Sequence, residues 1–135
     1  KEIVDVKLNL DFIDASPAST DPEAATSLPY DYVEEDAQRM SFMKRFAEAM
    51  DVKVVKALAA ELEDRFGKLP PPAKRLVLLA ELRVRCAAER ISHIDVKGTR
   101  AVFYRCGSRD IAFVRDLKGK KPDRKIHELI GLVNA

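Results

Sequence analysis

The chain of 135 residues contains only two cysteines, five glycines and no tryptophan. So few cysteines exclude a small secreted scaffold held together by disulfides. No apolar run approaches the roughly 20 residues that span a membrane, and no signal-peptide pattern opens the sequence. The motifs GxxxxGKS/T, GxGxxG and GxSxG are also missing, which excludes the familiar phosphate-binding loops and the serine-hydrolase elbow.

What is present is a globular composition with an uneven charge distribution. Hydrophobic residues make up 47% and charged residues 34% of the chain, which suits one domain spanning 1–135 with a real core. The net charge is only +2, but residues 1–39 carry −7 and residues 83–135 carry +7. This asymmetry is compatible with two solvated faces, with an attraction within one fold, or with two surfaces for different partners. Because the chain starts at Lys1 rather than methionine, we expect a fragment of a longer protein.

The first 29 residues indicate a strand followed by a loop. Residues 2–13 alternate for most of their length between apolar and polar side chains, which predicts a strand with one wet face. Residues 14–29 contain three prolines among alanine, serine and threonine, and such a segment continues neither a helix nor a central strand. We therefore predict a flexible loop over 14–29.

A helical unit is predicted over 30–92. Apolar residues at helical spacing indicate three helices, over about 34–49, 51–65 and 72–91. Asp51 is the expected N-cap of the second helix, and Gly67 is expected to end it in a left-handed conformation.

The pattern changes over 93–135. Residues 93–96 and 101–105 are β-rich runs around a Lys-Gly-Thr turn, which is a hairpin signal, and 111–114 is a third candidate strand. Residues 123–133 predict a closing helix. The fold class is therefore α+β, with about three helices packed with a small antiparallel β-sheet and a C-terminal helix.

The sequence offers little for catalysis or metal binding. Cys86 and Cys106 form no CxxC pair, and His93 and His127 add no second pair of ligands. A zinc site needs four ligands, usually in close pairs, so we expect no metal, no cofactor and two reduced cysteines. Since neither histidine has an obvious nucleophile partner nearby in sequence, we also expect no catalytic residues in this domain.

Glu61, Asp64 and Arg65 allow two interpretations. Helical spacing places these three charges on one face, with Leu62 and Phe66 turned inward. One interpretation is an exposed helix end in which Glu61 and Arg65 pair at i,i+4, worth a few tenths of a kcal/mol. The other is a mixed-charge surface that docks another protein domain, where charges set specificity and association rate more than affinity.

The basic C-terminal region, residues 100–125, is also open to more than one interpretation. Its cations could contact phosphates and its interleaved aromatic side chains could stack on bases, which predicts a nucleic-acid-binding accessory module. A solvated basic face and a surface for an acidic protein are the alternatives. The cations are Arg100, Arg105, Arg109, Arg115, Lys118, Lys120, Lys121, Arg124 and Lys125, and the aromatic residues are Phe103, Tyr104 and Phe113.

One block of the sequence is similar to a known signature. Residues 61–70, Glu-Leu-Glu-Asp-Arg-Phe-Gly-Lys-Leu-Pro, resemble the E-L-x-D-R-F-G-x-L-P motif in the C-terminal (TRCF) domain of the bacterial transcription-repair coupling factor, Mfd. The resemblance runs from Leu28 to about Val96, and residues 100–135 match the family little. Its other segments are 4–8, 28–33, 39–45 and 80–83.

The resemblance implies a parent protein that is a large, cytoplasmic, ATP-driven translocase on double-stranded DNA. It would displace stalled RNA polymerase and recruit UvrA for nucleotide-excision repair, with the motor, its ATP and magnesium, and the polymerase-binding module outside this chain. In that family the C-terminal domain is not catalytic, docks on the N-terminal UvrA-binding module and autoinhibits the protein. The family's docking residues correspond to Glu61, Asp64 and Arg65, so the resemblance favours the docking interpretation of that face.

Overall fold

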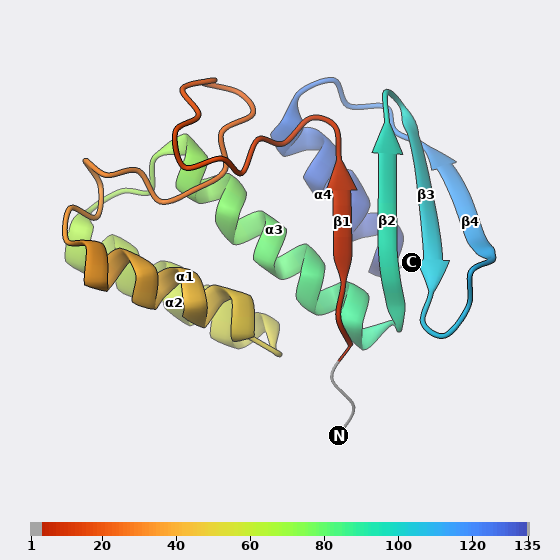
Figure 1. Cartoon of the computed structure of the whole chain (residues 1–135), viewed down its shortest axis with the longest axis horizontal. Helices are drawn as coiled ribbons and strands as arrows, with labels where there is room; N and C mark the ends of the chain where they lie inside the picture. Colours follow the sequence, from red (N-terminus) through yellow and green to blue (C-terminus); the bar gives the residue numbers. More distant parts are fainter. Residues whose placement is uncertain (1–3, 135) are drawn as a thin grey trace. The chain divides into compact units, whose positions relative to one another are not determined.

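The computed structural model describes residues 4–134, and these form four helices and four strands in an α+β arrangement (Figure 1). The expected fold class is confirmed. The described part of the chain divides into two compact units, which we call the sheet unit (residues 4–12 and 82–134) and the helical unit (residues 13–81).

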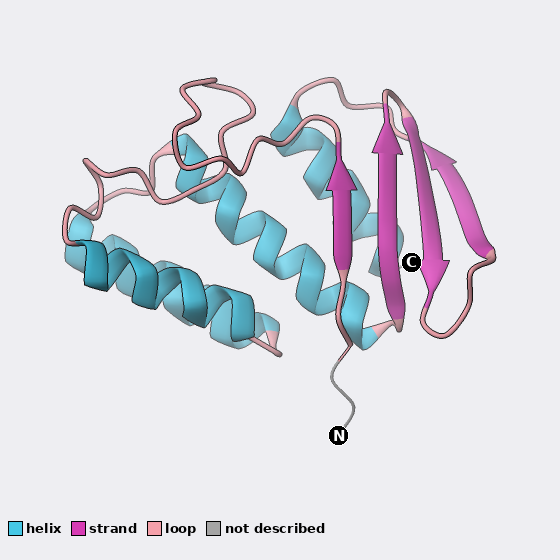
Figure 2. Ribbon diagram, in the orientation of Figure 1, coloured by secondary structure: helices cyan, strands magenta, loops and turns pink. Residues whose placement is uncertain are grey.

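The sheet unit contains one sheet with the strand order β1-β2-β3-β4, drawn in magenta in Figure 2. These strands are β1 (Lys7–Leu10), β2 (Ile91–Lys97), β3 (Arg100–Arg105) and β4 (Ile111–Asp116). The β2–β3 and β3–β4 pairs are antiparallel, but β1 lies parallel to β2. The sheet is thus mixed rather than wholly antiparallel, because the long segment between β1 and β2 lets the chain return to the same end of the sheet. Residues 2–3 of the expected first strand lie outside the described residues.

One face of this sheet is covered by α4 (Pro122–Asn134), which lies behind it in Figure 1. Along β3, and along β2 beyond a bulge between Ile91 and His93, every second side chain is buried, among them Ile94, Val96 and Phe103. The buried stripe of α4 is Ile126, Leu129, Ile130 and Val133. The core of the sheet unit is therefore built from β-branched and aromatic strand residues and one amphipathic helix.

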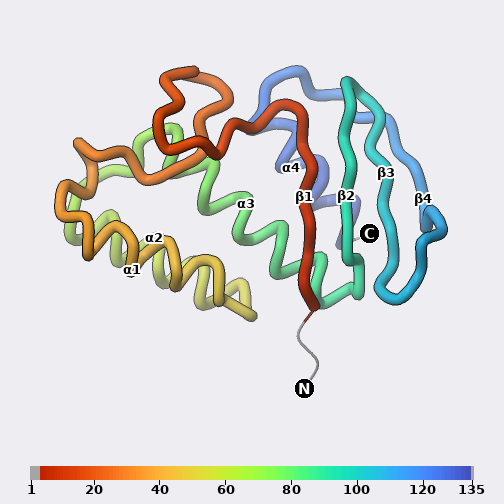
Figure 3. The backbone as a smooth tube through the Cα atoms, in the orientation of Figure 1, coloured from red at the N-terminus to blue at the C-terminus, as the bar shows by residue number. Residues whose placement is uncertain are grey.

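The helical unit contains α1 (Asp36–Glu48) and α2 (Val52–Phe66), which lie side by side (Figure 3). The third helix, α3 (Pro71–Ala88), begins in this unit and ends in the sheet unit. Asp51 is the predicted N-cap of α2, since its carboxylate accepts the backbone N–H of Lys53 at 2.7 Å. Gly67 ends α2 with a φ of 92°, a conformation that side chains with a Cβ avoid. The predicted N-cap is confirmed. Gly67 has the positive φ that was predicted, but its ψ of −173° lies outside the left-handed helical region, so α2 ends in an extended turn rather than in an αL cap.

Residues 14–28 form a loop that is tied to the start of α3 by Arg75. This arginine is only 3% exposed. Its Nε donates to the carbonyl of Ala25 at 2.8 Å, and its Nη2 donates to the carbonyl of Pro22 at 3.0 Å. The role of Arg75 was not predicted from the sequence, because a single arginine in a helix carries no local signal for a loop 50 positions earlier.

Candidate docking site

The last two turns of α2 carry the three predicted site residues. Asp64 and Arg65 are exposed and Glu61 is half-buried, whereas Leu62 is fully buried. A helix that buries one face produces this pattern. We call Glu61, Asp64 and Arg65 the charged face of α2.

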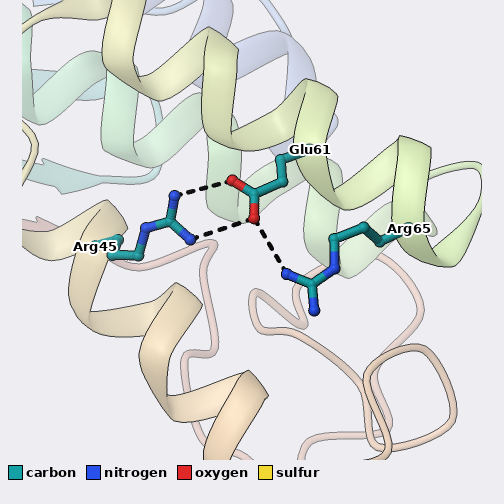
Figure 4. Close-up of polar contacts among 3 residues, drawn as sticks. All are labelled: Arg45, Glu61 and Arg65. Carbon is teal, nitrogen blue, oxygen red and sulfur yellow. Dashed lines mark hydrogen bonds and ion pairs between the residues drawn. The ribbon is translucent and has the colours of Figure 1, made fainter.

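Glu61 is the centre of this face, and it binds two arginines (Figure 4). Arg65 Nη1 lies 3.1 Å from Glu61 Oε2, which is the i,i+4 pair that the spacing predicts. Arg45, at the end of α1, approaches from the other side, with Nη2 at 2.9 Å from Oε1 and Nη1 at 3.4 Å from Oε2. Arg45 was not among the predicted site residues, since nothing in the local pattern relates the end of α1 to the end of α2.

The two arginines change the titration of Glu61. The hydrogen bond from Arg45 lowers the pKa of the Glu61 carboxyl most; partial desolvation opposes this, and the hydrogen bond from Arg65 lowers the pKa further. Glu61 is therefore a carboxylate throughout the neutral range.

Aromatic rings lie under both guanidinium groups. The guanidinium carbon of Arg45 is 5.1 Å from the ring centroid of Phe42, and that of Arg65 is 5.6 Å from the same centroid. Arg65 is also 5.3 Å from the ring of Phe66, which packs edge-on against Phe42. Because the ring faces attract cations, they help to position both arginines beside Glu61.

Asp64 differs from Glu61 because its carboxylate has no partner among the described residues. It is exposed, and no hydrogen bond or ion pair to it is recorded among residues 4–134. The charged face thus combines one free carboxylate with one carboxylate already held by two cations. It can offer a partner both acceptors and donors.

The turn after α2 is stabilised by Tyr32, which belongs to segment 28–33, one of the segments that resemble the TRCF family. The Tyr32 hydroxyl donates to the carbonyl of Gly67 at 2.7 Å, and its ring packs edge-on against Phe66 at 5.9 Å between centroids. Burial raises the pKa of the Tyr32 hydroxyl. The segments 28–33 and 61–70 therefore meet at the end of α2.

The two cysteines differ in their surroundings. Cys86 is fully buried in α3, and burial raises the pKa of its thiol to about 12. Cys106 is half-buried, and both thiols are free. No group of three or more histidine, cysteine, aspartate or glutamate side chains gathers as a metal site within the described part of the chain. No helix among the described residues has the length and apolar character needed to cross a membrane.

In the basic region 100–125 the cationic side chains are exposed to solvent, whereas the aromatic side chains are largely covered. Eight of its nine cations are exposed; Lys125 is half-buried and donates to the carbonyl of Gly98 at 3.2 Å. Phe103 is fully buried, and Phe113 stacks on it at 4.3 Å between centroids. Phe113 and Tyr104 are both half-buried, and the Tyr104 ring stacks on His93 at 4.9 Å between centroids. Because each of these rings already packs against another ring, base stacking has little surface there.

A groove of about 650 Å³ on the sheet unit includes this tyrosine in its lining. Asp11, Asp95, Lys97 and Arg100 contribute equal numbers of carboxylates and cations to it. Asp95 Oδ1 lies 2.9 Å from Asn9 Nδ2 and 2.8 Å from Nε2 of His93. With balanced charges, this groove selects neither an anionic nor a cationic ligand.

These features belong to a recognised class of domain. The family model of the TRCF domain matches residues 23–113, a range that includes the charged face of α2, Arg45 and Tyr32. The chain therefore belongs to the TRCF domain family, and the resemblance noted in the sequence is confirmed.

The relatives at the level of sequence are transcription-repair-coupling factors. The protein from Mycobacterium tuberculosis is 37% identical over 75 residues, which cover 56% of this chain and 6% of that protein. The Haemophilus influenzae protein is 40% identical over 76 residues, covering 56% and 6%. The Escherichia coli protein is 43% identical over 56 residues, covering 42% and 5%. The matched part of the chain thus spans only a small fraction of the length of these relatives.

A solved structure supports the same fold. The crystal structure of the C-terminal domain of a transcription-repair coupling factor superposes with a TM-score of 0.66, covering 97% of this chain and 96% of that one. The sequence identity of this pair is 12%, so the likeness concerns the fold.

Proposed function

We propose that this chain is the non-catalytic C-terminal regulatory domain of a transcription-repair coupling factor. The observation that carries the proposal is the charged face of α2, which lies on the motif 61–70 inside the range that matches the TRCF family. The names of the curated relatives point to the parent protein.

The parent, in this proposal, is a cytoplasmic ATP-dependent translocase on double-stranded DNA. It displaces stalled RNA polymerase and recruits UvrA, and therefore couples transcription to nucleotide-excision repair. ATP and magnesium belong to the motor, and this domain needs neither. Its part is regulatory.

The charged face of α2 docks on the N-terminal UvrA-binding module of the same protein. Asp64 and Glu61 offer carboxylates to cations of that module, and Arg65 offers a guanidinium to an acidic group. Contacts of this kind suit a reversible interface, because interfaces between domains of one chain are more polar than obligate ones. The docked form hides the UvrA-binding surface and restrains the motor.

Activation is then a shift between two populations. A ligand that binds only the open form, such as UvrA or the engaged polymerase, draws the equilibrium away from the docked form. The free energy by which the ligand shifts this equilibrium is at most the difference between its binding free energies for the two forms. Substitutions that weaken the docking contact also increase the population of the open form.

Calorimetric titration of the chain with the separately expressed UvrA-binding module tests this proposal. The variant with Glu61→Ala, Asp64→Ala and Arg65→Ala is the critical comparison. We expect saturable binding by the unmodified chain and loss of binding by the variant. The variant should remain folded, since exposed ion pairs contribute only about 0–1 kcal/mol each.

A second measurement uses the parent protein. The same three substitutions should increase capture of UvrA and raise ATP-driven translocation, because they open the docked form. If neither activity changes, the charged face of α2 is not the docking surface.

The second candidate function is nucleic-acid binding by the basic region 100–125, and the exposure of eight of its nine cations favours it. Its signature is an affinity of the chain for DNA that falls steeply between about 50 and 200 mM salt. Exchange of exposed cations such as Arg109 and Lys120 for glutamine should weaken that affinity. Weak binding without this salt dependence would contradict the candidate.

A further inference from the structure

Arg45 holds both carboxylate oxygens of Glu61, and this contact joins α1 to α2 (Figure 4). With Arg65 also bound to Oε2, three N–H groups already point at this one carboxylate. A guanidinium that reaches both oxygens forms the strongest common type of ion pair with a carboxylate. Glu61 is therefore occupied before any partner arrives.

The charged face of α2 has two carboxylates, Asp64 and Glu61, and they differ in how readily they can bind a cation of a partner. Asp64 is exposed and uncommitted, so it can accept a cation directly. Three of the roughly four acceptor sites of the Glu61 carboxylate are taken by arginines of this chain, so a partner's cation can engage both of its oxygens only by displacing one of them. The side chains of Arg45 and Glu61 are 46% and 35% exposed, so the pair is accessible to such an exchange.

We propose that Arg45 is an internal competitor that sets the strength of docking, by occupying Glu61 until a cationic side chain of the partner displaces it. This inference rests on the proposed docking of the charged face of α2. It adds to that proposal a residue of α1, Arg45, which competes with the partner's cation for Glu61.

The ring of Phe42 makes the exchange possible at low cost. The Arg45 guanidinium lies 5.1 Å from the centroid of this buried ring, an attraction that does not depend on Glu61. Arg45 can therefore release the carboxylate and stay over the ring. The competition weakens the docked form without abolishing it, which a clamp that must open requires.

Arg45→Gln in the full chain tests the inference, with the UvrA-binding module as the titrant. Removing the competitor should tighten binding about two- to fivefold, the range that an exposed ion pair accounts for. Lys44→Gln is the matched control, because it removes the same charge from the neighbouring exposed position, where no contact with Glu61 is recorded. We expect the control to change the affinity much less.

Arg45→Lys provides a second variant with the charge retained. An ammonium cannot bridge the two oxygens as a guanidinium does, so binding should tighten by an intermediate factor. In the double variant Arg45→Gln with Glu61→Gln, the gain from Arg45→Gln should vanish, because no carboxylate is left to release.

The outcomes separate the two proposals. If the triple-alanine variant loses binding but Arg45→Gln behaves like Lys44→Gln, or weakens binding, the role of Arg45 is wrong and the docking function stands. If the triple-alanine variant binds as well as the unmodified chain, or if the chain does not bind the module, the docking function fails and the role of Arg45 fails with it. Circular dichroism of each variant verifies that it is folded.

Discussion

The Tyr32 hydroxyl donates a hydrogen bond of 2.7 Å to the carbonyl of Gly67, across a separation of 35 positions in the chain. Gly67 is the residue at which α2 ends, immediately after the charged face. A helix end leaves carbonyl groups without partners, and Tyr32 supplies one of the missing donors. The segment before α1 therefore fixes the turn that follows the candidate docking site.

Tyr32→Phe should lower the free energy of unfolding by about 1 kcal/mol, the net value of one intramolecular hydrogen bond. Urea unfolding followed by circular dichroism measures the change. Tyr30→Phe is the control, because Tyr30 is 64% exposed and its hydroxyl makes no hydrogen bond to another residue of the described range 4–134. Equal effects of the two substitutions would show that the Tyr32 hydroxyl does not stabilise the turn.

Arg75→Met should lower the free energy of unfolding by about 2 kcal/mol, because it removes hydrogen bonds from a charged, buried donor. The same variant should speed amide hydrogen exchange in residues 21–26, which the arginine ties to α3. Lys74→Met removes a charge from the exposed neighbouring position and serves as the control. A loop whose exchange is unchanged in Arg75→Met would contradict this assignment.

Glu61→Gln should reduce the acid sensitivity of the fold. Since folding lowers the pKa of Glu61, its carboxylate stabilises the fold at all pH values above the unfolded pKa. That contribution is lost as the pH falls below the ordinary pKa of glutamate and then through the lowered pKa of the folded state. The free energy of unfolding of the unmodified chain should therefore fall more steeply with acid than that of the variant.

The measurement for Glu61 is urea unfolding at a series of pH values between neutral and acid. Glu48→Gln is a suitable control, because Glu48 is exposed and no ion pair to it is recorded in the described range 4–134. Parallel curves for the unmodified chain and Glu61→Gln would mean that the two arginines do not stabilise the carboxylate.

The two thiols should differ sharply in reactivity. A thiolate is the reactive form, and burial keeps Cys86 protonated with a pKa of about 12. Titration of the native chain with a disulfide reagent should therefore modify Cys106 first, and Cys86 only after a denaturant is added. Cys106→Ser should remove the fast reaction, and Cys86→Ser should leave it. A fast reaction in Cys106→Ser would show that Cys86 is reached in the native fold.

The helices and their ends were predictable because they depend on residues close in the sequence. The apolar spacing located α1, α2 and α3 to within a few residues, although the expected third helix continued beyond Ala88 to residue 91. The N-cap at Asp51 and the stop at Gly67 follow from one side chain and one backbone conformation. The exposure of Asp64 and Arg65 followed from the same spacing, since a helix that buries Leu62 leaves those positions outside.

The sequence by itself determined the order of elements, the caps, the hairpin and the face on which the charges of α2 lie, because each results from interactions within a few positions. The tertiary structure alone decided three long-range relationships: the parallel pairing of β1 with β2, the tie of Arg75 to the carbonyl of Ala25, and the contact of Arg45 with Glu61. In each case a residue could have met several partners. Tertiary packing determines which partner the residue contacts, and the residues near it in the sequence do not predict that partner.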